Sequence, residues 1–451
     1  MTRRPALLPA LFTLAFSSAT AASAPVLDPA VRERAEALVR ANEHTSLVIA
    51  VIDGPDSTVT GFGTVADGKA QLPDADTVYE IGSATKTMTG LLLADAVVAG
   101  KARLGQPVAE LLPDFSIPAS GQRRITLLDL ATHYSGLPRL PGNLAPADAG
   151  NPYADYSADK LRSYLAGHQL TRAPGDGFEY SNLAYGLLGT ALASQAGASY
   201  EILLQQRIAQ PLGMKSTSSV LSPALRARLA QGHGTDGKPA RNWDFQAIAG
   251  AGAVLSSARD LVAYVQSYML KPDAAHVLAV KKQAELGGGK GIALAWIVDQ
   301  AKGQPFTWHN GQTGGYASFI GFTADGRKGV VVLSSTSRQV DALGVASLVP
   351  GTLPPLQAVP KEVAISAADL VQYEGRYALA PQFILSVRQG PDGLLAGATG
   401  QPEVPVYASG KDRFFYKVVD AQLEFKRDDQ GAITSLVLYQ NGQALPGKRL
   451  P

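Results

Sequence analysis

The chain of 451 residues is 46% apolar, so it can bury a large core and form two or three domains. Its 40 Lys and Arg balance 38 Asp and Glu, which leaves no basic field for nucleic acid or acidic lipid. Cysteine is absent, which excludes disulfides, thiol nucleophiles and thiolate metal sites. The six histidines form no His-x-His or His-x-x-x-His pair, so we expect neither a metal nor another cofactor.

Residues 1–21 have the pattern of a secretory signal peptide. Two arginines precede a short apolar run from Pro5 to Phe16, and Ala19-Thr20-Ala21 supplies a small-residue cleavage site. The run is too short to span a bilayer, and no later segment reaches roughly 18 uninterrupted apolar residues. We therefore expect a periplasmic or secreted protein with no integral membrane segment after the signal is removed.

Four β-rich runs suggest how the two ends of the larger domain meet. Residues 46–54 and 57–65 read as a hairpin around a Gly-Pro-Asp turn, and residues 316–322 and 329–334 flank an Asp-Gly turn. We expect both regions to join in one antiparallel sheet. Residues from about 80 to 300 would then form a mainly helical insertion.

A Pro-rich segment at residues 351–360 is expected to link two domains, residues 22–350 and residues 361–451. In the C-terminal segment, short β-prone pieces alternate with Asp-Gly, Asp-Gln-Gly and Asn-Gly turns. This alternation of short strands and turns predicts a small all-β barrel or sandwich.

The first segment whose residues could carry out catalysis contains Ser83 and Lys86. Gly82 and Ser83 lead into an expected helix, and the three-residue spacing brings the lysine amine near the serine hydroxyl. The start of a helix also offers free amides where an acyl oxyanion would form. A serine beside a neutral lysine suits a nucleophile and base, but a lone Ser-x-x-Lys is common by chance.

The second segment places Tyr180 and Asn182 after the Gly-rich turn that begins at Pro174. A phenol can shuttle a proton, and a carboxamide can hold a substrate amide. In isolation, aromatic packing and helix capping explain these two residues better.

The third segment is His309-Asn-Gly311-Gln312, a Gly-rich stretch that enters the expected strand 316–322. Glycine permits close approach to a ligand, and His309 offers a cationic or donor edge. A single histidine is more often a structural residue.

In this order, Ser-x-x-Lys, Tyr-x-Asn and His-x-Gly resemble the three motifs of the serine β-lactamase and penicillin-binding protein superfamily. The Tyr-x-Asn form is similar to its class-C-like branch, with D,D-peptidase and esterase members. Residues 127–138 and 250–260 are also similar to signatures of that branch. The resemblance covers roughly residues 30 to 350, and the C-terminal segment looks like a small β domain often appended to such hydrolases.

The resemblance implies an α/β fold of the β-lactamase/transpeptidase type, in which helices flank an antiparallel sheet that carries a large helical insertion. It implies that Ser83 is the nucleophile and that Lys86 and Tyr180 are its acid/base partners, without fixing which of the two is the base in each step. No cofactor is implied.

The same resemblance implies a substrate-binding role for four other residues. Asn182 would hold the substrate amide, and His309 would occupy the cation position of the third motif. Gly311 belongs to that motif, and the backbone N–H of Gln312 would complete an oxyanion hole with that of Ser83.

Export and motif pattern together favour a D-Ala-D-Ala carboxypeptidase or endopeptidase acting on peptidoglycan peptides. The third motif has histidine where class C β-lactamases carry Lys-Thr-Gly, which shifts weight from antibiotic hydrolysis towards peptidase or esterase activity. A class-C-like β-lactamase, a small-ester esterase and a binding protein for muropeptides or β-lactams that does not turn over remain open. The expected partner is a small-molecule or peptide substrate, and the sequence does not indicate the oligomeric state.

Overall fold

The computed structural model describes residues 24–355, 361–380, 383–390, 393–399, 403–417, 421–440 and 443–451. The expected signal peptide, residues 1–21, lies outside the described residues, as do residues 356–360 of the expected linker. Within the described ranges no helix is both long enough and apolar enough to cross a bilayer.

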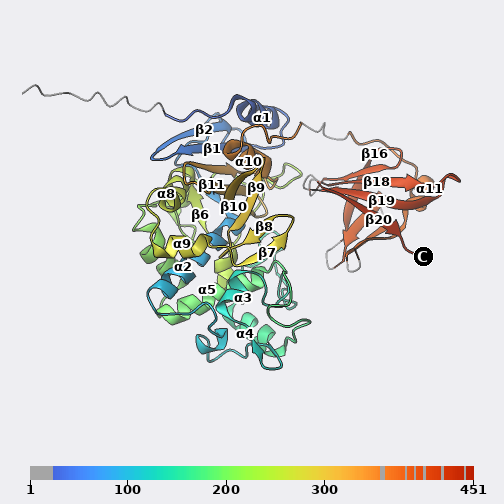
Figure 1. The fold of residues 1–451 in the computed structure, drawn as a ribbon. Helices are drawn as coiled ribbons and strands as arrows, with labels where there is room; N and C mark the ends of the chain where they lie inside the picture. Colours follow the sequence, from blue (N-terminus) through green and yellow to red (C-terminus); the bar gives the residue numbers. More distant parts are fainter. Residues whose placement is uncertain are drawn as a thin grey trace, which may run out of the picture.

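An eight-stranded antiparallel sheet forms the centre of the larger domain, in the order β2-β1-β12-β11-β10-β9-β8-β7 (Figure 1). The expected union of the first and last strands is confirmed, because β1 pairs with β12 from Leu47 opposite Ser334 to Asp53 opposite Lys328. The strands are β1 (Ser46–Asp53), β2 (Asp56–Gly63), β7 (Ala284–Gly287), β8 (Lys290–Ile292), β9 (Ile297–Ala301), β10 (Gln304–Gln312), β11 (Ala317–Thr323) and β12 (Lys328–Ser334).

Both faces of this sheet are covered, which explains why β1 is apolar at nearly every position. Leu47 and Ile49 join the cluster that packs under α1 (Pro29–Arg40) and α10 (Asp341–Leu348). Their neighbours Val48 and Ala50 point to the other face, towards α8 (Ala258–Met269). Successive side chains on a strand point to opposite faces, so a strand between two helical layers must be apolar throughout.

The insertion between β2 and β7 is mainly helical, as expected, but it ends earlier than residue 300. Strands β7, β8 and β9 belong to the sheet and occupy residues 284–301. All three are short, β7 and β8 contain glycine, and β7 and β9 are partly exposed, so none has the apolar run that marks a buried strand. Pairing fixes them in the sheet, β9 with β10, β8 with β9 and β7 with β8, and no local sequence pattern shows this pairing.

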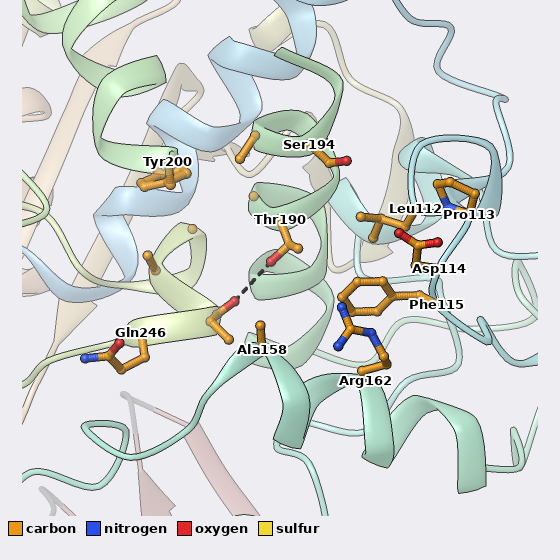
Figure 2. A pocket seen from close by; sticks show the side chains of 15 residues that line it. Leu112, Pro113, Asp114, Phe115, Ala158, Arg162, Thr190, Ser194, Tyr200 and Gln246 are labelled. Carbon is orange, nitrogen blue, oxygen red and sulfur yellow. Dashed lines mark hydrogen bonds between the residues drawn. The ribbon is translucent and has the colours of Figure 1, made fainter. Parts of the chain in front are cut away.

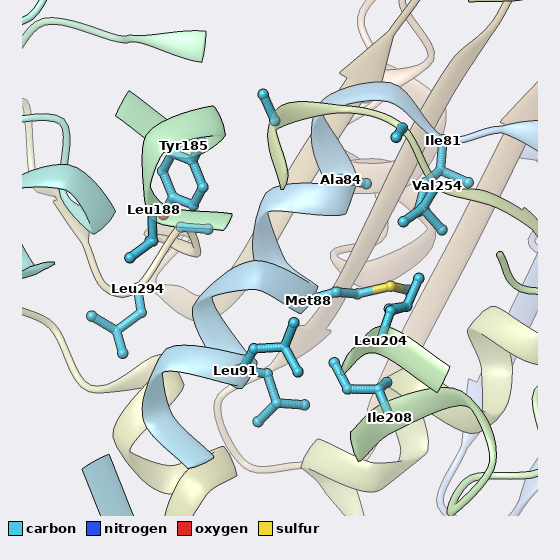
Figure 3. Close-up of a cluster of buried hydrophobic side chains, with 14 of the residues drawn as sticks. Ile81, Ala84, Met88, Leu91, Tyr185, Leu188, Leu204, Ile208, Val254 and Leu294 are labelled. Carbon is cyan, nitrogen blue, oxygen red and sulfur yellow. The ribbon is translucent and has the colours of Figure 1, made fainter. Parts of the chain in front are cut away.

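Helix α2 (Thr85–Val98) forms the centre of the helical region and is buried on nearly all sides at its start. Figure 3 shows Met88 of this helix within a cluster that also contains Leu204 and Val254. Helix α5 (Asn182–Ala196) and the short helical segment η4 (Gln246–Ala251) also contact α2. This packing fixes the position of the residues that precede the helix. The other helices there are α3 (Leu127–Ala131), α4 (Ala158–Gly167), α6 (Tyr200–Leu204), α7 (Pro223–Arg226) and α9 (Ala274–Val280).

The C-terminal domain is a closed eight-stranded barrel, one of the two architectures expected from its turns (Figure 1). Tyr377, Phe414 and Phe425 are buried in its core. The barrel follows α11 (Ala367–Leu370) and comprises β13 (Gly375–Ala380), β14 (Phe383–Gly390), β15 (Gly393–Ala398), β16 (Val404–Gly410), β17 (Arg413–Tyr416), β18 (Ala421–Arg427), β19 (Ile433–Gln440) and β20 (Gln443–Arg449).

Truncating Met88 to alanine should destabilise the larger domain by about 2–5 kcal/mol, because the side chain is fully buried and its removal leaves a cavity. Denaturant unfolding measures this loss. Val98→Ala on the same helix is the control: that side chain is 51% exposed, and we expect a change within about 0.5 kcal/mol. Equal effects of the two substitutions would contradict the assignment of the core.

Candidate active site

Ser83 lies between a short strand, β3 (Val78–Glu80), and the first turn of α2, within the 3-10 segment η1 (Gly82–Ala84). The first amides of a helix have no partner within the helix, so the Ser83 N–H is available to a ligand. Strand β10 runs alongside η1. The arrangement places the predicted nucleophile at a helix start, beside the third predicted motif.

The Lys86 amine has three polar neighbours and is completely buried. Its Nζ lies 3.0 Å from Ser83 Oγ and 2.9 Å from Asn182 Oδ1. The third neighbour is the backbone oxygen of Ala251, at 2.6 Å. Two of these partners are carbonyl oxygens, which only accept hydrogen bonds, whereas the third is a hydroxyl that can also donate.

This set of partners fits a neutral lysine. Burial holds the pKa of Lys86 well below its usual range, and the positive charge of Arg139 lowers the pKa further. A neutral amine has two N–H donors and one lone pair. In this neutral form the donors can serve the oxygens of Asn182 and Ala251, which would leave the lone pair free to accept the proton of the Ser83 hydroxyl.

Tyr180 completes the polar group around the serine, because its hydroxyl donates to Ser83 Oγ at 2.6 Å. Burial raises the pKa of Tyr180 to about 12, although the hydrogen bond to Ser83 and the charge of Arg139 oppose this rise. The phenol is therefore protonated at neutral pH and acts as a donor. Its ring centre lies 4.9 Å from Lys86 Nζ.

The start of α5 and the neighbouring residue His133 hold residues 180–182 in place. Ser181 is the N-cap of α5, and its hydroxyl accepts from the Ala184 amide. Asn182 is therefore the first residue of helix α5. His133 packs its ring 4.5 Å from that of Tyr180, and its Nδ1 accepts from the Ser181 amide.

His309 is buried on the β10 face that is turned towards Lys86 and His133. Burial lowers the pKa of His309 to about 4, although its hydrogen bond with the backbone oxygen of Asn310 opposes this shift. The imidazole is therefore neutral at neutral pH. It occupies the third-motif position without supplying a fixed positive charge.

Two glycines allow β10 to approach the serine segment. A Cβ on Gly311 would lie 1.9 Å from the Ile81 carbonyl oxygen, and a Cβ on Gly82 would lie 2.6 Å from the Gln312 nitrogen. Gly82 also has a φ of +50°, which side chains other than glycine rarely adopt. Ser318 Oγ reinforces the contact by donating to Ile81 O at 2.7 Å.

The direction of the Gln312 N–H follows from the pairing of β10 with β11, in which hydrogen-bonded and non-hydrogen-bonded residue pairs alternate. Thr313 N donates to Tyr316 O, so the next pair, Gln312 and Ala317, is a non-hydrogen-bonded pair. The Gln312 N–H therefore points away from β11. Strand β9 pairs with β10 only as far as Trp308, which leaves this N–H directed towards Gly82 and the serine segment.

Two residues near the site were missed by sequence reasoning. Tyr153 and Arg139 both act on the site electrostatically: the charge of Arg139 lies close to Lys86 and Tyr180, and Tyr153 lies beside Asn182. The guanidinium carbon of Arg139 is 5.0 Å from the Tyr180 ring centre. Neither residue belongs to a motif, but Arg139 directly follows the resembling stretch 127–138.

A pocket of about 420 Å³ lies between α5, η4 and residues 112–115 (Figure 2). Thr190 Oγ1 spans its base by donating to the Ala247 oxygen at 3.1 Å. None of the predicted site residues lines this pocket, although it shares η4 with the Lys86 contact. In the described part of the chain, no group of three or more His, Asp or Glu side chains could hold a metal ion.

Comparison with known proteins places this fold and site in a class. The serine β-lactamase and penicillin-binding superfamily of serine hydrolases has this architecture, and the Beta-lactamase family profile matches residues 31–347. The chain belongs to the Beta-lactamase family. A second profile, a domain of unknown function called DUF3471, matches residues 359–449.

Relatives carry peptidase and β-lactamase names. The D-alanyl-D-alanine-carboxypeptidase/endopeptidase AmpH of Escherichia coli K12 is 31% identical over 59% of this chain and 70% of its own length. Penicillin-binding protein 4 of Amycolatopsis lactamdurans is 27% identical over 64% of this chain and 80% of its length.

Solved structures agree on the fold. A β-lactamase/D-alanine carboxypeptidase from Yersinia pestis, solved with citrate, matches with a TM-score of 0.62 and 26% identity, covering 69% of this chain and 92% of its own. An octameric penicillin-binding protein homologue from Pyrococcus abyssi has a TM-score of 0.64 and 20% identity, covering 93% of this chain and 99% of its own. At that identity the second likeness concerns the fold alone.

Gly311→Ala should lower the rate of Ser83 acylation by about 100-fold or more. The new Cβ would push β10 away from Ile81 and displace the Gln312 amide, and loss of one oxyanion donor costs about that much. Acylation kinetics with a chromogenic ester measure the effect. Gly105→Ala is the matched control, since its Cβ would meet nothing within 4 Å. Acylation at the wild-type rate in Gly311→Ala would refute the proposed role of the glycine contact.

The pH profile of acylation should reflect the lowered pKa of Lys86. Because the pKa of Lys86 is depressed, kcat/KM falls only as the pH drops through that low pKa, and it gains nothing as the pH rises through 10.5, where an ordinary lysine titrates. Ester hydrolysis across the pH range, corrected for the Ser83→Ala background, tests this. A rate that climbs about tenfold per pH unit towards 10.5 would mean that Lys86 is normally charged.

Proposed function

We propose that this serine hydrolase is an exported D-Ala-D-Ala carboxypeptidase or endopeptidase that acts on peptidoglycan peptides through an acyl-enzyme. The observation that carries the proposal is the pair of hydrogen bonds at Ser83 Oγ, one with the buried Lys86 amine and one from the Tyr180 hydroxyl. These groups provide a base and a proton donor within hydrogen-bond distance of one nucleophile.

The residues suit a two-step acyl transfer. The Ser83 oxygen attacks the scissile carbonyl and forms a C–O bond while its proton passes to the Lys86 amine. The N–H groups of Ser83 and Gln312 stabilise the resulting oxyanion. When the intermediate collapses, the C–N bond breaks, and the leaving amine takes a proton relayed from Lys86 through Tyr180. Water then attacks the ester, the acid product leaves, and Ser83 recovers its proton.

Three observations favour a peptide substrate over a β-lactam or a small ester. AmpH is a carboxypeptidase/endopeptidase by name, and it aligns with 59% of this chain. The side-chain amide of Asn182 contacts the Lys86 amine, which itself contacts the nucleophile, so it lies near enough to the site to pair with a substrate amide. The signal-like residues 1–21 support export to the compartment that contains peptidoglycan.

The experiment uses purified protein and two measurements. Intact mass after a penicillin pulse should show an adduct on wild type and none on Ser83→Ala, because only the serine can be acylated. Release of D-alanine from a diacetyl-Lys-D-Ala-D-Ala peptide should occur with wild type alone. The same spectrum reports whether residues 1–21 have been removed from protein recovered after export.

The outcomes separate the candidate functions. A persistent adduct with D-alanine release supports the peptidase. Rapid return to the free mass with opened penicillin and no D-alanine release would replace it with a β-lactamase. A permanent adduct without any product would indicate a binding protein, and hydrolysis of short esters without an adduct or D-alanine release would indicate an esterase.

A further inference from the structure

Glu80 is a buried acidic residue that takes no part in the acyl transfer described above. It is the last residue of β3, three positions before Ser83, and its side chain is only 4% exposed. One carboxyl oxygen, Oε1, accepts from the Asn242 side chain and from the Trp243 amide, each at 2.9 Å. The other, Oε2, is buried and has no hydrogen-bond partner among the described residues. A buried polar atom without a partner is costly, so Oε2 requires a neighbouring donor or acceptor.

Thr313 has a second unpaired oxygen nearby. Its side chain is 3% exposed, and within the described part of the chain its Oγ1 forms no hydrogen bond. The hydroxyl nevertheless lies close to the carboxyl of Glu80: burial raises the pKa of Glu80, and interaction with the Thr313 hydroxyl opposes that rise. A hydrogen bond between Glu80 Oε2 and Thr313 Oγ1 would pair both oxygens, because one proton between them satisfies each.

The contacts of Glu80 reach both ends of the connection between β10 and β11, residues 313–316. Thr313 begins this connection, and its N–H donates to Tyr316 O at 3.0 Å. The Asn242 amide that binds Glu80 Oε1 also donates to the Tyr316 hydroxyl, at 3.1 Å. The carboxyl therefore lies near the start of the connection at Thr313 and contacts its end through Asn242.

The middle of the same connection packs on the other residue that Glu80 binds. A Cβ on Gly314 would lie 2.8 Å from Trp243 Nε1, so glycine is needed for this close approach. The backbone of Trp243 is in turn fixed by its hydrogen bond to Glu80 Oε1. Loss of the carboxyl would thus release the surface on which the connection rests.

Both N–H groups of the expected oxyanion hole are joined to Glu80 by short paths. The Ser83 amide lies three residues further along the main chain, and the Gln312 amide belongs to the residue before Thr313. The two segments are in contact, because a Cβ on Gly82 would lie 2.6 Å from the Gln312 nitrogen. Movement of the connection would change the spacing of the two donors, and oxyanion stabilisation requires donors about 2.7–3.1 Å from the charged oxygen.

We propose that Glu80 is a positioning residue that keeps the Gln312 amide in the oxyanion hole by linking the strand before Ser83 to the connection after β10. The proposal rests on the acyl transfer proposed for Ser83 and adds the residue that holds its two N–H donors together. Glu80 does not touch the substrate in this role and acts only through the backbone that it supports.

The neutral acid form of Glu80 fits this role. Its O–H can donate to Thr313 Oγ1 while Oε1 accepts from Asn242 and Trp243. A carboxylate would instead add a buried negative charge three residues from the nucleophile, where negative charge develops on the substrate. Burial favours the neutral form, and the nearby charge of Asp244 acts in the same direction.

The test uses the whole protein and an ester that acylates Ser83. The probe is para-nitrophenyl acetate with a carbon-13 label at the carbonyl. Release of para-nitrophenol gives the rate constant and KM of acylation, and the infrared stretch of the labelled carbonyl reports hydrogen bonding to the acyl-enzyme. Oxyanion donors act mainly in the transition state, so their displacement lowers the rate constant with little change in KM, and it raises the carbonyl frequency. A defect in stability alone does not shift that frequency in protein that is still folded.

We expect Glu80→Ala to lower the acylation rate constant by about 10- to 100-fold, to change KM by less than about twofold and to raise the carbonyl frequency. Glu80→Gln should acylate within about threefold of wild type, because its amide keeps the acceptor and donates to Thr313 in place of the acid. Thr313→Val removes the other half of the link and should cost about tenfold. Combined with Glu80→Ala it should add no further loss.

Asp260→Ala is the matched control. Asp260 is also 4% exposed, burial also raises its pKa, and its carboxylate accepts from the Thr217 hydroxyl at 2.9 Å. Its other side-chain partner is the Ser216 amide, and neither partner is a site residue. The control should lower the stability of the domain and leave the carbonyl frequency unchanged. All variants are compared at a temperature where their unfolding curves show folded protein.

Failure of the positioning role and failure of the proposed function look different. Wild-type acylation and carbonyl frequency in Glu80→Ala would overturn the role while the serine hydrolase function stands, and so would equal effects of Glu80→Ala and Asp260→Ala. If Glu80→Gln is as impaired as Glu80→Ala, or if Thr313→Val behaves as wild type, the link through Oε2 is overturned. These last two variants decide the matter if Glu80→Ala does not fold. If wild type is not acylated above the Ser83→Ala background, the acyl-transfer function itself fails.

Discussion

The burial of one amine is the constraint on which the site depends. A charged lysine without a carboxylate would be costly in this interior, so burial lowers the pKa of Lys86 and favours the neutral amine, whose two N–H groups match two carbonyl oxygens. These oxygens come from Asn182 on α5 and from Ala251 on η4. The packing of both elements against α2 therefore serves the chemistry, because a shift of either would leave the amine with an unpaired donor or free it to take a proton.

A second constraint is the distance between the two halves of the site. The helix start and strand β10 lie more than two hundred residues apart in sequence, yet they touch through backbone atoms at Gly82 and Gly311. Glycine is required there because a Cβ on Gly311 would overlap the Ile81 oxygen. The sheet that joins the first and last strands brings the two segments into register, so fold and oxyanion geometry are specified together.

Much of the fold and of the candidate site could be predicted because it depends on local sequence patterns or on motifs that occur in a known order along the chain. The motif residues Ser83, Tyr180 and His309 meet in one place, and the turn-rich tail forms a barrel. Strands β7 to β9 were missed because their place depends on pairing, of β9 with β10 and of β8 and β7 outward from β9, and not on an apolar pattern. Arg139 was missed for a similar reason: its significance comes from a ring that lies 41 positions later, and no spacing rule connects them.

The nearly complete burial of the first turns of α2 has a consequence for how the enzyme loses activity. Residues from Thr85 to Ala94 are all shielded from solvent, so no local fraying can expose the Lys86 segment to hydrogen exchange. Its amides can open only with the core around Met88. We therefore expect the helix that carries Lys86 to be among the most slowly exchanging parts of the domain, and inactivation by heat or denaturant to follow global unfolding rather than early loosening of this helix.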